Sequence, residues 1–512
     1  MPRKKATDSI IRRILAGERN LDLIKREECR RFSIANMITN PELVERFPKK
    51  KLTEEIRLLI LKKPTRTLSG VTPIAVMVKP QGSCRYKCAY CFFSGLAAKS
   101  YTGYEPAALR AKQYLFDPYM QAKSRVEQFE GGGHPADKCE LIIMGGTFLQ
   151  MEKTYKKNFV KGAYEALNGR RSKTLEGAIK ANEKAKHRAV GLTIETRPDV
   201  CIPYIDEMLS YGATRVELGV QHPDNAIYSR INRGHKVQDV ADSTRALKNA
   251  AFKVLYHIMP GLPGSDKKKD IAMVKRLFSD QNFRPDMLKI YPTLVIEGSE
   301  LYNMMKRGEY EPYSAEEAAD VISEFYRYIP EYARVMRVQR DIPAQRIMHG
   351  VKKSNLRELV EQKIRDKKII PQEIRWREIG LQRKKIELSG FDLKTLSYRA
   401  SGGEEHFLSF ENKEKIIAGF LRMRFPDQGQ RPEIGDSAAL VRELHVYGSE
   451  APIEHEGQVQ HHGFGSELLD EAERIAKENS KKKMVIISGV GVRQYYRKRG
   501  YSLEGPYMAK RL

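Results

Sequence analysis

Cys84-Arg85-Tyr86-Lys87-Cys88-Ala89-Tyr90-Cys91 places three cysteines within eight residues, directly after the apolar run from Val71 to Val78. Half of the chain's 6 cysteines lie here, at C-x3-C-x2-C spacing. Three thiolates on one loop can hold three irons of a 4Fe-4S cluster and leave the fourth iron open to a small molecule. A structural zinc usually takes four ligands from paired C-x2-C units, and the sequence has no second pair. The stretch therefore predicts an iron-sulfur site with Cys84, Cys88 and Cys91 as metal ligands.

The region after Gly70 alternates short β-rich runs with longer helical runs. This alternation predicts a parallel sheet covered by helices, an α/β fold that closes into a full or partial TIM-like barrel. In such a barrel the functional residues lie at the carboxyl ends of the strands. The expected strands are Val71–Val78, Glu140–Gly145, Val190–Thr196, Arg215–Val220, Lys253–Met259 and Met287–Tyr291.

Polar and glycine-rich motifs follow these strands in order. Alone, a diglycine is typical of a turn and a glutamate of a structural ion pair. Together with the cysteine loop they resemble the site of the radical S-adenosylmethionine (SAM) enzymes, in which the amino and carboxylate groups of SAM fill the open iron site. The resemblance implies SAM contacts at Gly145, Gly146, Thr147, Glu195 and Gln221.

A different unit begins near Phe391. Its β-rich runs lead to Gln460-x-x-Gly463-x-Gly465 and then to an amphipathic helix, Glu467 to Asn479. Small residues at a strand-to-helix junction expose backbone amides, and a helix N-terminus favours anions, so this motif suits a pyrophosphate. A plain glycine-rich helix start is the alternative. The motif resembles the acyl-coenzyme A loop of GNAT acetyltransferases, and Tyr495-Tyr496 before Gly500-Tyr501 resembles the end of that domain.

Positive charge is the second large feature of the chain. It has 91 lysines and arginines against 65 aspartates and glutamates, a formal net charge of +26. Residues 1–66 carry 18 basic and 9 acidic side chains, with helical segments at Ile10–Ala16 and Thr53–Lys62. A clustered excess of this size favours a nucleic-acid partner, with an anionic membrane surface or inherited basic composition as alternatives.

The chain carries no apolar run of the roughly 18 residues that span a membrane and no secretory leader. An exposed iron-sulfur cluster needs reducing conditions, so we expect a cytoplasmic protein without membrane association. We expect four parts: a basic helical segment at 1–69, a barrel at 70–335, a basic connector at 336–390 and a GNAT-like domain at 391–512. Trp376, the single tryptophan, lies in the connector, and we expect it to pack between domains rather than to stack on RNA.

Seven longer motifs together resemble one family, the catalytic subunits of Elongator, which are tRNA uridine acetyltransferases, in an archaeal or bacterial-like single-chain form. The resemblance extends from about Gly70 to the C-terminus. The motifs are Ser100–Pro106, Met144–Phe148, Gly191–Asp199, Arg215–Gln221, Arg337–Pro343, Arg442–Gly448 and Ile487–Gly491 with Tyr495–Lys498.

The resemblance implies roles for single residues. Cys84, Cys88, Cys91, Lys138 and Tyr496 would be catalytic, with Lys138 reaching acetyl-coenzyme A from the barrel across a cleft shared by the two domains. Tyr495, Tyr496 and His445 are alternative general bases for release of coenzyme A. The expected acetyl-coenzyme A contacts are Lys138, Glu443, Leu444, His445, Val446, Gln460, Gly463, Phe464, Gly465, Ser466 and Tyr496.

The resemblance also implies a reaction and partners. A SAM-derived radical would activate the methyl group of acetyl-coenzyme A, which would add to C5 of the wobble uridine in a tRNA anticodon loop, and thioester hydrolysis would leave a carboxymethyl group. Elongator-like subunits would be further partners. Two alternatives stay open: a protein lysine acetyltransferase with a structural iron-sulfur domain, and a tRNA-binding subunit without turnover.

Overall fold

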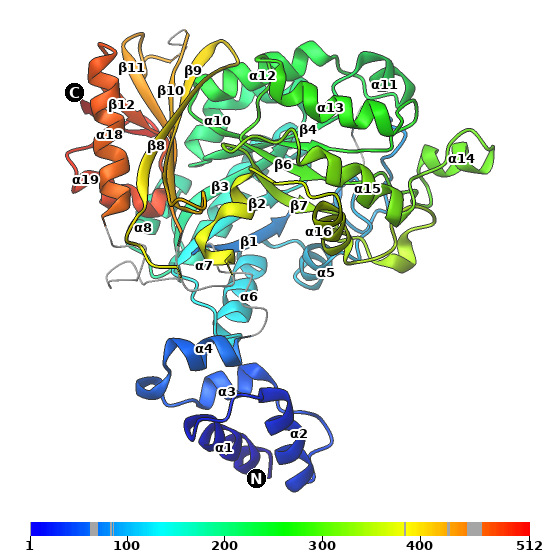
Figure 1. Ribbon diagram of the computed structural model, residues 1–512, viewed down its shortest axis with the longest axis vertical. Coiled ribbons are helices and arrows are strands. Elements are labelled where there is room, and N and C mark those ends of the chain that lie inside the picture. The colour runs from blue at the N-terminus through cyan, green and yellow to red at the C-terminus, as the bar shows by residue number, and fades with distance from the viewer. Residues whose placement is uncertain are drawn as a thin grey trace.

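The computed structural model describes residues 2–61, 70–81, 84, 86–382, 386–427, 431–447 and 463–512. It contains a small helical unit at the N-terminus and two seven-stranded sheets, one after the other along the chain (Figure 1). The first sheet is parallel, and the second is mixed.

The first sheet is the expected incomplete barrel, with strand order β1-β2-β3-β4-β5-β6-β7. β1 and β7 are its edges and do not pair with each other, so the barrel is open along one side. β7 was not expected; it extends the sheet beyond residue 335, where we expected the barrel to end. The strands are β1 (Thr72–Met77), β2 (Lys138–Met144), β3 (Arg188–Thr196), β4 (Arg215–Gln221), β5 (Lys253–Ile258), β6 (Met287–Ile290) and β7 (Arg334–Val338).

Helices between these strands, and two helices after β7, surround the barrel. Each buries an apolar face, and several begin at a polar cap; in α15, Ser314 and Glu317 form a reciprocal capping box. The helices are α5 (Pro106–Gln113), α6 (Pro118–Gly131), α7 (Lys153–Asn168), α8 (Leu175–Asn182), α9 (Pro198–Cys201), α10 (Ile205–Ser210), α11 (Asn225–Arg230), α12 (Val237–Asn249), α13 (Lys267–Ser279), α14 (Glu300–Lys306), α15 (Ala315–Phe325), α16 (Leu356–Asp366) and α17 (Ile374–Arg377). Trp376 of α17 packs edge-on against Tyr326 at the end of α15, with ring centroids 6.2 Å apart, so this contact ties the connector to the barrel.

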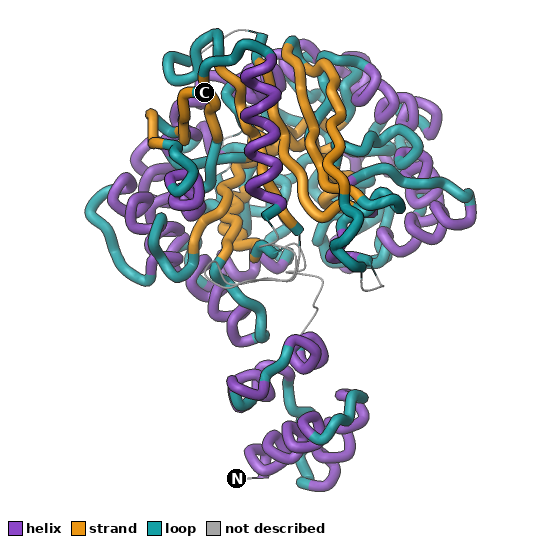
Figure 2. Tube along the Cα trace, turned by 60° about the vertical axis from the view of Figure 1, so that its left-hand side comes forward, coloured by secondary structure: helices purple, strands orange, loops and turns teal. Residues whose placement is uncertain are grey.

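The second sheet has the order β13-β14-β12-β11-β10-β9-β8. α18 (Phe464–Glu478) lies across its face, as Figure 2 shows, and buries Leu468, Leu469 and Ala472 there. α19 (Arg493–Arg497) follows a 3-10 turn, η7 (Val490–Val492). The strands are β8 (Asp392–Ala400), β9 (Gly403–Glu411), β10 (Ile417–Phe425), β11 (Ala438–Val446), β12 (Lys483–Ile486), β13 (Ser502–Glu504) and β14 (Tyr507–Arg511).

The second sheet packs against the amino-terminal ends of the barrel strands. Arg442 of β11 donates two hydrogen bonds, of 2.7 and 2.6 Å, to Asp286, the residue before β6, and a third of 2.7 Å to Glu405 of β9. All three side chains are buried. Farther along, Arg493 pairs with Glu183 at 3.2 Å. These contacts fix the second unit to one end of the barrel.

Two glycines allow the closest approach between the units. A Cβ added at Gly489 would lie 2.0 Å from the carbonyl oxygen of Val190, and one added at Gly491 would lie 2.4 Å from the Cβ of Arg188. Both distances are impossible for real atoms, so this turn requires glycine where it meets the start of β3. The requirement explains why Ile487–Gly491 carries two glycines.

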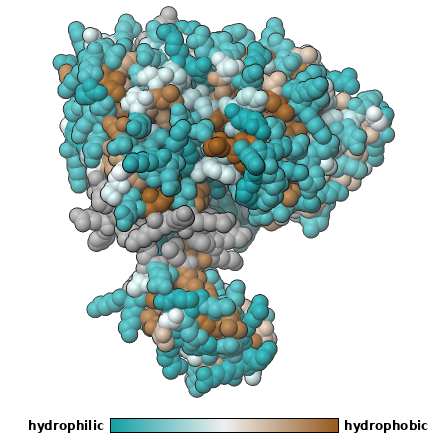
Figure 3. Space-filling view, viewed as in Figure 1, coloured by the Kyte–Doolittle hydropathy of each residue, from teal (hydrophilic) through white to brown (hydrophobic). Residues whose placement is uncertain are grey.

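The N-terminal unit has its own small core and lies apart from the two sheets (Figure 1). It consists of α1 (Pro2–Leu15), α2 (Leu21–Arg31), α3 (Asn40–Arg46) and α4 (Glu54–Ile60). The molecular face seen in Figure 3 is mainly hydrophilic, with small separate hydrophobic patches. Among the described residues, no helix combines the length and the apolar character needed to cross a bilayer.

Candidate active site

The cysteine loop opens into a cavity of about 360 Å³ in the barrel. Cys84, Cys88 and Cys91 line it together with residues at the carboxyl ends of the strands, as the barrel rule predicts. Of the expected SAM contacts, Gly146, Thr147, Glu195 and Gln221 also line this cavity. The structure therefore gathers the two predicted groups in one place.

Two buried arginines surround the middle cysteine. Nη1 of Arg233 lies 3.5 Å from the Cys88 sulfur, and Nη1 of Arg197 lies 3.7 Å from it. Arg197 is held by Asp199 through an Nε–Oδ1 contact of 3.0 Å. Burial opposes ionisation of the Cys88 thiol, but the two guanidinium groups outweigh it and lower its pKa. Cys88 is thus prepared to be a thiolate, the form that binds iron.

The three thiols also fit a shared cationic group. Burial and the neighbouring Cys88 raise the pKa of Cys91 to about 11, because a second thiolate beside the first is unfavourable. An iron cluster would remove this penalty, since its positive irons neutralise several thiolates at once. The donor set and its charge therefore fit a 4Fe-4S cluster held by Cys84, Cys88 and Cys91.

The diglycine after β2 is tied to the end of β3. Gly145 has φ 137°, a conformation that favours glycine, and its N–H donates to Glu195 over 3.1 Å. The Tyr101 hydroxyl also donates to this carboxylate, at 3.0 Å. An added Cβ at Gly146 would meet nothing within 4 Å, so its backbone is open to a ligand. Gln221 has φ 67°, unusual for a residue with a side chain and typical of functional positions.

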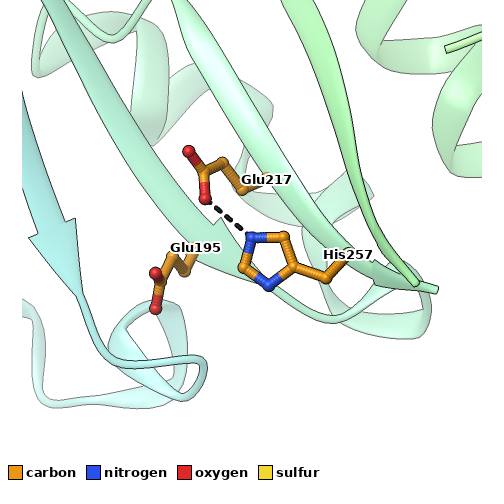
Figure 4. Close-up of side chains that lie close together, drawn as sticks. All are labelled: Glu195, Glu217 and His257. Atoms are coloured by element: carbon orange, nitrogen blue, oxygen red, sulfur yellow. Dashed lines mark hydrogen bonds and ion pairs between the residues drawn. The ribbon is translucent and has the colours of Figure 1, made fainter. Parts of the chain in front are cut away.

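Charged side chains line the deeper part of the same cavity, three of which are drawn in Figure 4. Ligand atoms of Glu195, Glu217 and His257 lie within 4.8 Å of one another, and His257 Nε2 lies 2.7 Å from Glu217. Lys289 also pairs with Glu217, and Arg215 lies 3.6 Å from it. Burial opposes ionisation of Glu217, but Lys289 and His257 outweigh it and lower its pKa. Because these side chains already balance the charge, we interpret the group as an ion-pair network rather than a metal site.

The second candidate site lies where β11 separates from β12. The two strands pair in parallel only from Ala438 to Val441, so residues 443–446 have one open backbone edge. Glu443 accepts from Arg422 at 2.8 Å and lies 3.6 Å from Lys253, on the barrel side. Leu444 and Val446 pack on the α18 side. The His445 ring lies tilted against Tyr447, with ring centroids 4.5 Å apart, and burial lowers its pKa to about 4.

Gly463, in the left-handed conformation at φ 87°, precedes the first residue of α18. A Cβ on Gly465 would lie 3.2 Å from the Tyr495 hydroxyl and 3.6 Å from Val446. The start of α18, the end of β11 and Tyr495 therefore meet at one point. The Tyr496 side chain is only 6% exposed and belongs to the core under the sheet. Gln460 lies outside the described residues.

Lys138 lies far from the cysteines. It begins β2, and Met144 at the other end of the strand lies six positions on, about 20 Å at 3.3 Å per residue. Its register partner on β3 is Arg188, which contacts the turn at Gly491. Lys138 is thus on the side of the second unit, and its role toward acetyl-coenzyme A stays a prediction. Because the second unit covers the amino ends of the strands and the cysteine cavity lies at their carboxyl ends, the two candidate sites lie toward opposite ends of the barrel.

Three basic residues at the two sites were not predicted from the sequence. Arg197 and Arg233 are distant from Cys88 in sequence and were not singled out as its partners. Arg499 donates to the Ser466 hydroxyl at the start of α18, and its guanidinium lies 4.8 Å from the centre of the Tyr495 ring. The basic run Arg497-Lys498-Arg499 beside a candidate phosphate loop was a signal that could have identified it.

Comparisons with known proteins agree with this architecture. Residues 78–277 match the model of the radical SAM superfamily, and residues 285–366 match the radical SAM C-terminal domain. The tRNA uridine(34) acetyltransferase of Methanocaldococcus jannaschii is 49% identical over 90% of this chain and 88% of its own length. Elongator complex protein 3 of Schizosaccharomyces pombe is 40% identical over 99% of this chain and 98% of its own.

A solved structure of the archaeal Methanocaldococcus infernus Elp3, lacking residues 1–46, matches with a TM-score of 0.78 and 47% identity. The match covers 87% of this chain and 100% of that one. A radical SAM enzyme is defined by a 4Fe-4S cluster and SAM, which suits the cysteine cavity. The chain belongs to the family of tRNA uridine(34) acetyltransferases and Elongator complex protein 3.

Proposed function

We propose that this chain is a radical SAM acyltransferase that modifies uridine 34, the wobble base of tRNA, with acetyl-coenzyme A as the acyl source. The observation that carries the proposal is the presence of two candidate sites in one chain. One is the cavity of Cys84, Cys88 and Cys91, and the other is the open edge of β11 beside the start of α18. The relatives' names supply the substrate class, and the two sites supply the chemistry.

Cys84, Cys88 and Cys91 would hold the cluster, and the backbone at Gly146 with Glu195 and Gln221 would hold SAM. When bound, these groups supply a carbon-centred radical that can take hydrogen from the acetyl methyl group, which makes a carbon–carbon bond at uracil C5 accessible. The chain's residues then position the reactants and exclude water. Arg197 and Arg233 favour the thiolate form of Cys88, and the Tyr101 hydroxyl donates to the Glu195 carboxylate.

In the second unit, the open backbone of residues 443–446 would bind the acyl-coenzyme A chain, and the amides at Gly463–Ser466 with Arg499 would bind its phosphates. Tyr495 is the side chain at the meeting point of β11 and α18. Burial raises its pKa, so its hydroxyl stays protonated at neutral pH and can give a proton to the departing thiolate. Lys138 approaches from the barrel side.

The test is anaerobic turnover with the reconstituted cluster, SAM, acetyl-coenzyme A and tRNA, followed by mass spectrometry of the nucleosides. We expect 5-carboxymethyluridine at position 34 with the wild type and none with Cys88→Ala. A lysine acetyltransferase would hydrolyse or transfer the acetyl group without any dependence on tRNA. A binding subunit would bind tRNA and leave acetyl-coenzyme A intact in its presence.

Relatives called Elongator complex protein 3 are named as parts of a complex. Partner subunits of that kind belong to the proposal for this chain as well. Because both candidate sites lie within one polypeptide, we expect the isolated chain to complete at least one turnover. Partners would then act on the choice of tRNA or on product release. Multiple-turnover assays with and without a cell extract measure these effects.

A further inference from the structure

Arg110 is a buried cation without a counter-ion among the described residues. It lies on α5, which packs against β1, and its side chain is 8% exposed. Nη2 donates to the carbonyl oxygen of Ala75 over 2.7 Å, whereas Nε is buried and has no hydrogen-bond partner in the described part of the chain. Burial lowers the pKa of Arg110, and no carboxylate offsets this effect. An uncompensated buried guanidinium is costly, and a bound anion would remove the cost.

The side chain faces a place that an anion can reach. Arg110 lines the same cavity as the three cysteines, and so does Arg125 of α6. Among the described residues lining this cavity, eight are lysine or arginine and four are aspartate or glutamate, so its potential is positive. The acidic residue nearest in sequence, Glu105, is already engaged: its carboxylate accepts from the backbone of Thr102 and Gly103 at 2.7 and 3.0 Å.

The location of Arg110 separates it from both cofactor sites. The cysteine loop follows β1, which has ended by Val78. Ala75 is three residues before Val78, so it lies about 10 Å along the strand from the rim that carries this loop. The candidate coenzyme A phosphate site is at the start of α18, beside Arg499. A phosphate at Arg110 would therefore sit along the open edge of the barrel, below the carboxyl rim.

We propose that Arg110, assisted by Arg125, is a phosphate subsite that holds one backbone phosphate of the substrate RNA at the open side of the barrel. The inference rests on the proposed function. A base that enters the barrel interior toward Glu195 and His257 must leave its backbone at the opening, and β1 and β7 leave that side unpaired. A guanidinium suits a phosphate because it donates two parallel hydrogen bonds.

The test is tRNA binding by fluorescence anisotropy over a range of salt concentrations. The variant Arg110→Gln keeps a donor for the Ala75 carbonyl and removes the charge. We expect its affinity for tRNA to fall on the order of tenfold to a hundredfold, and the slope of log affinity against log salt to fall by about 0.7 to 0.9. The matched control is Lys477→Gln, the same loss of charge at an exposed position on α18, which should change both quantities little.

Arg110→Lys keeps the charge and should restore the salt slope, which separates anion binding from structural support. Far-UV circular dichroism and iron content confirm folding of each variant. Unchanged tRNA binding and slope in Arg110→Gln would overturn the subsite, and so would a loss of affinity for acetyl-coenzyme A in its place. If wild-type protein binds tRNA through Arg110 yet makes no modified uridine, the proposed function fails and the subsite stands.

Discussion

Replacing Arg442 by methionine should loosen the contact between the second sheet and the barrel. Arg442 donates to Asp286 at 2.7 and 2.6 Å, to Glu405 at 2.7 Å and to the carbonyl oxygen of Phe252 at 3.0 Å. The side chains of Arg442 and Asp286 are 0% exposed. Methionine fills a similar length but leaves two buried carboxylates short of positive charge. Removing one partner of a buried ion pair costs about 3–5 kcal/mol.

Hydrogen exchange measures this loss of free energy at the strands that form the contact. A loss of 3–5 kcal/mol in the free energy of local opening corresponds to about a 10²- to 10³·⁵-fold loss of amide protection. We expect this loss at the amides of β6 and β11 in Arg442→Met. The control is Arg474→Met on α18, whose ion pair with Glu471 at 2.7 Å is exposed and should contribute less than about 1 kcal/mol.

A double variant tests whether the unpaired carboxylate causes the loss of protection. Arg442→Met combined with Asp286→Asn removes one unpaired charge and should regain part of the lost protection. Burial opposes ionisation of Asp286 in the wild type, but Arg442 and Lys248 outweigh it and lower its pKa. This carboxylate therefore stabilises the fold above its unfolded pKa of about 3.9, and the contribution disappears as the pH falls below that value. Equal protection in Arg442→Met and Arg474→Met would refute the reasoning.

Three further predictions concern the two sites. Cys88→Ala should lose cluster iron, measured by iron and sulfide analysis, while its affinity for tRNA stays at the wild-type value. Arg233→Gln removes a positive charge beside the Cys88 sulfur, so the cluster's reduction potential should fall, on the order of 60 mV for a tenfold change in a one-electron equilibrium. A potentiometric EPR titration measures the potential. An unchanged potential would contradict the contact between Arg233 and the Cys88 sulfur. Tyr495→Phe should slow tRNA-dependent hydrolysis of acetyl-coenzyme A about a hundredfold. Its effect should exceed that of Tyr496→Phe, because the Tyr495 hydroxyl lies against Gly465. A larger effect of Tyr496→Phe would instead identify Tyr496 as the proton donor.

The sequence correctly predicted the place of a motif in the fold where the motif directly follows an apolar strand-forming run. The cysteine loop, the diglycine and Glu195 follow apolar runs directly, and parallel strands bring their carboxyl ends together, so their meeting in one cavity follows from the pattern. β7 escaped notice because Arg334-Val-Met-Arg-Val mixes charged and apolar residues. Its first arginine is buried against Glu378, 44 residues away, and no local pattern reveals such a partner.

The relation between the two sites could not be read from the sequence for a similar reason. Lys138 indicated that the barrel and the second unit share a site, but the end of the barrel that the second unit covers depends on buried pairs between distant residues, such as Arg442 with Asp286. Tyr496 was favoured over Tyr495 by motif position alone. The structure distinguishes the two neighbours by burial, since Tyr496 packs in the core and Tyr495 faces the start of α18.

The buried pairs at the amino ends of the strands also bear on how the two sites cooperate. Breaking the buried pair of Arg442 with Asp286 alone costs about 3–5 kcal/mol, so a form in which the second sheet has left the barrel is populated at less than about one part in 10². A hinge motion that brings the start of α18 to the cysteine cavity would have to break these buried pairs in each cycle. The longer strands, β2 with 7 residues and β3 with 9, span about 20 to 30 Å, and the cavity reaches from Cys84 down to Pro73, the second residue of β1. A group that moves within this cavity leaves the buried pairs of the interface intact, so we expect the two halves of the reaction to be linked without separation of the two units.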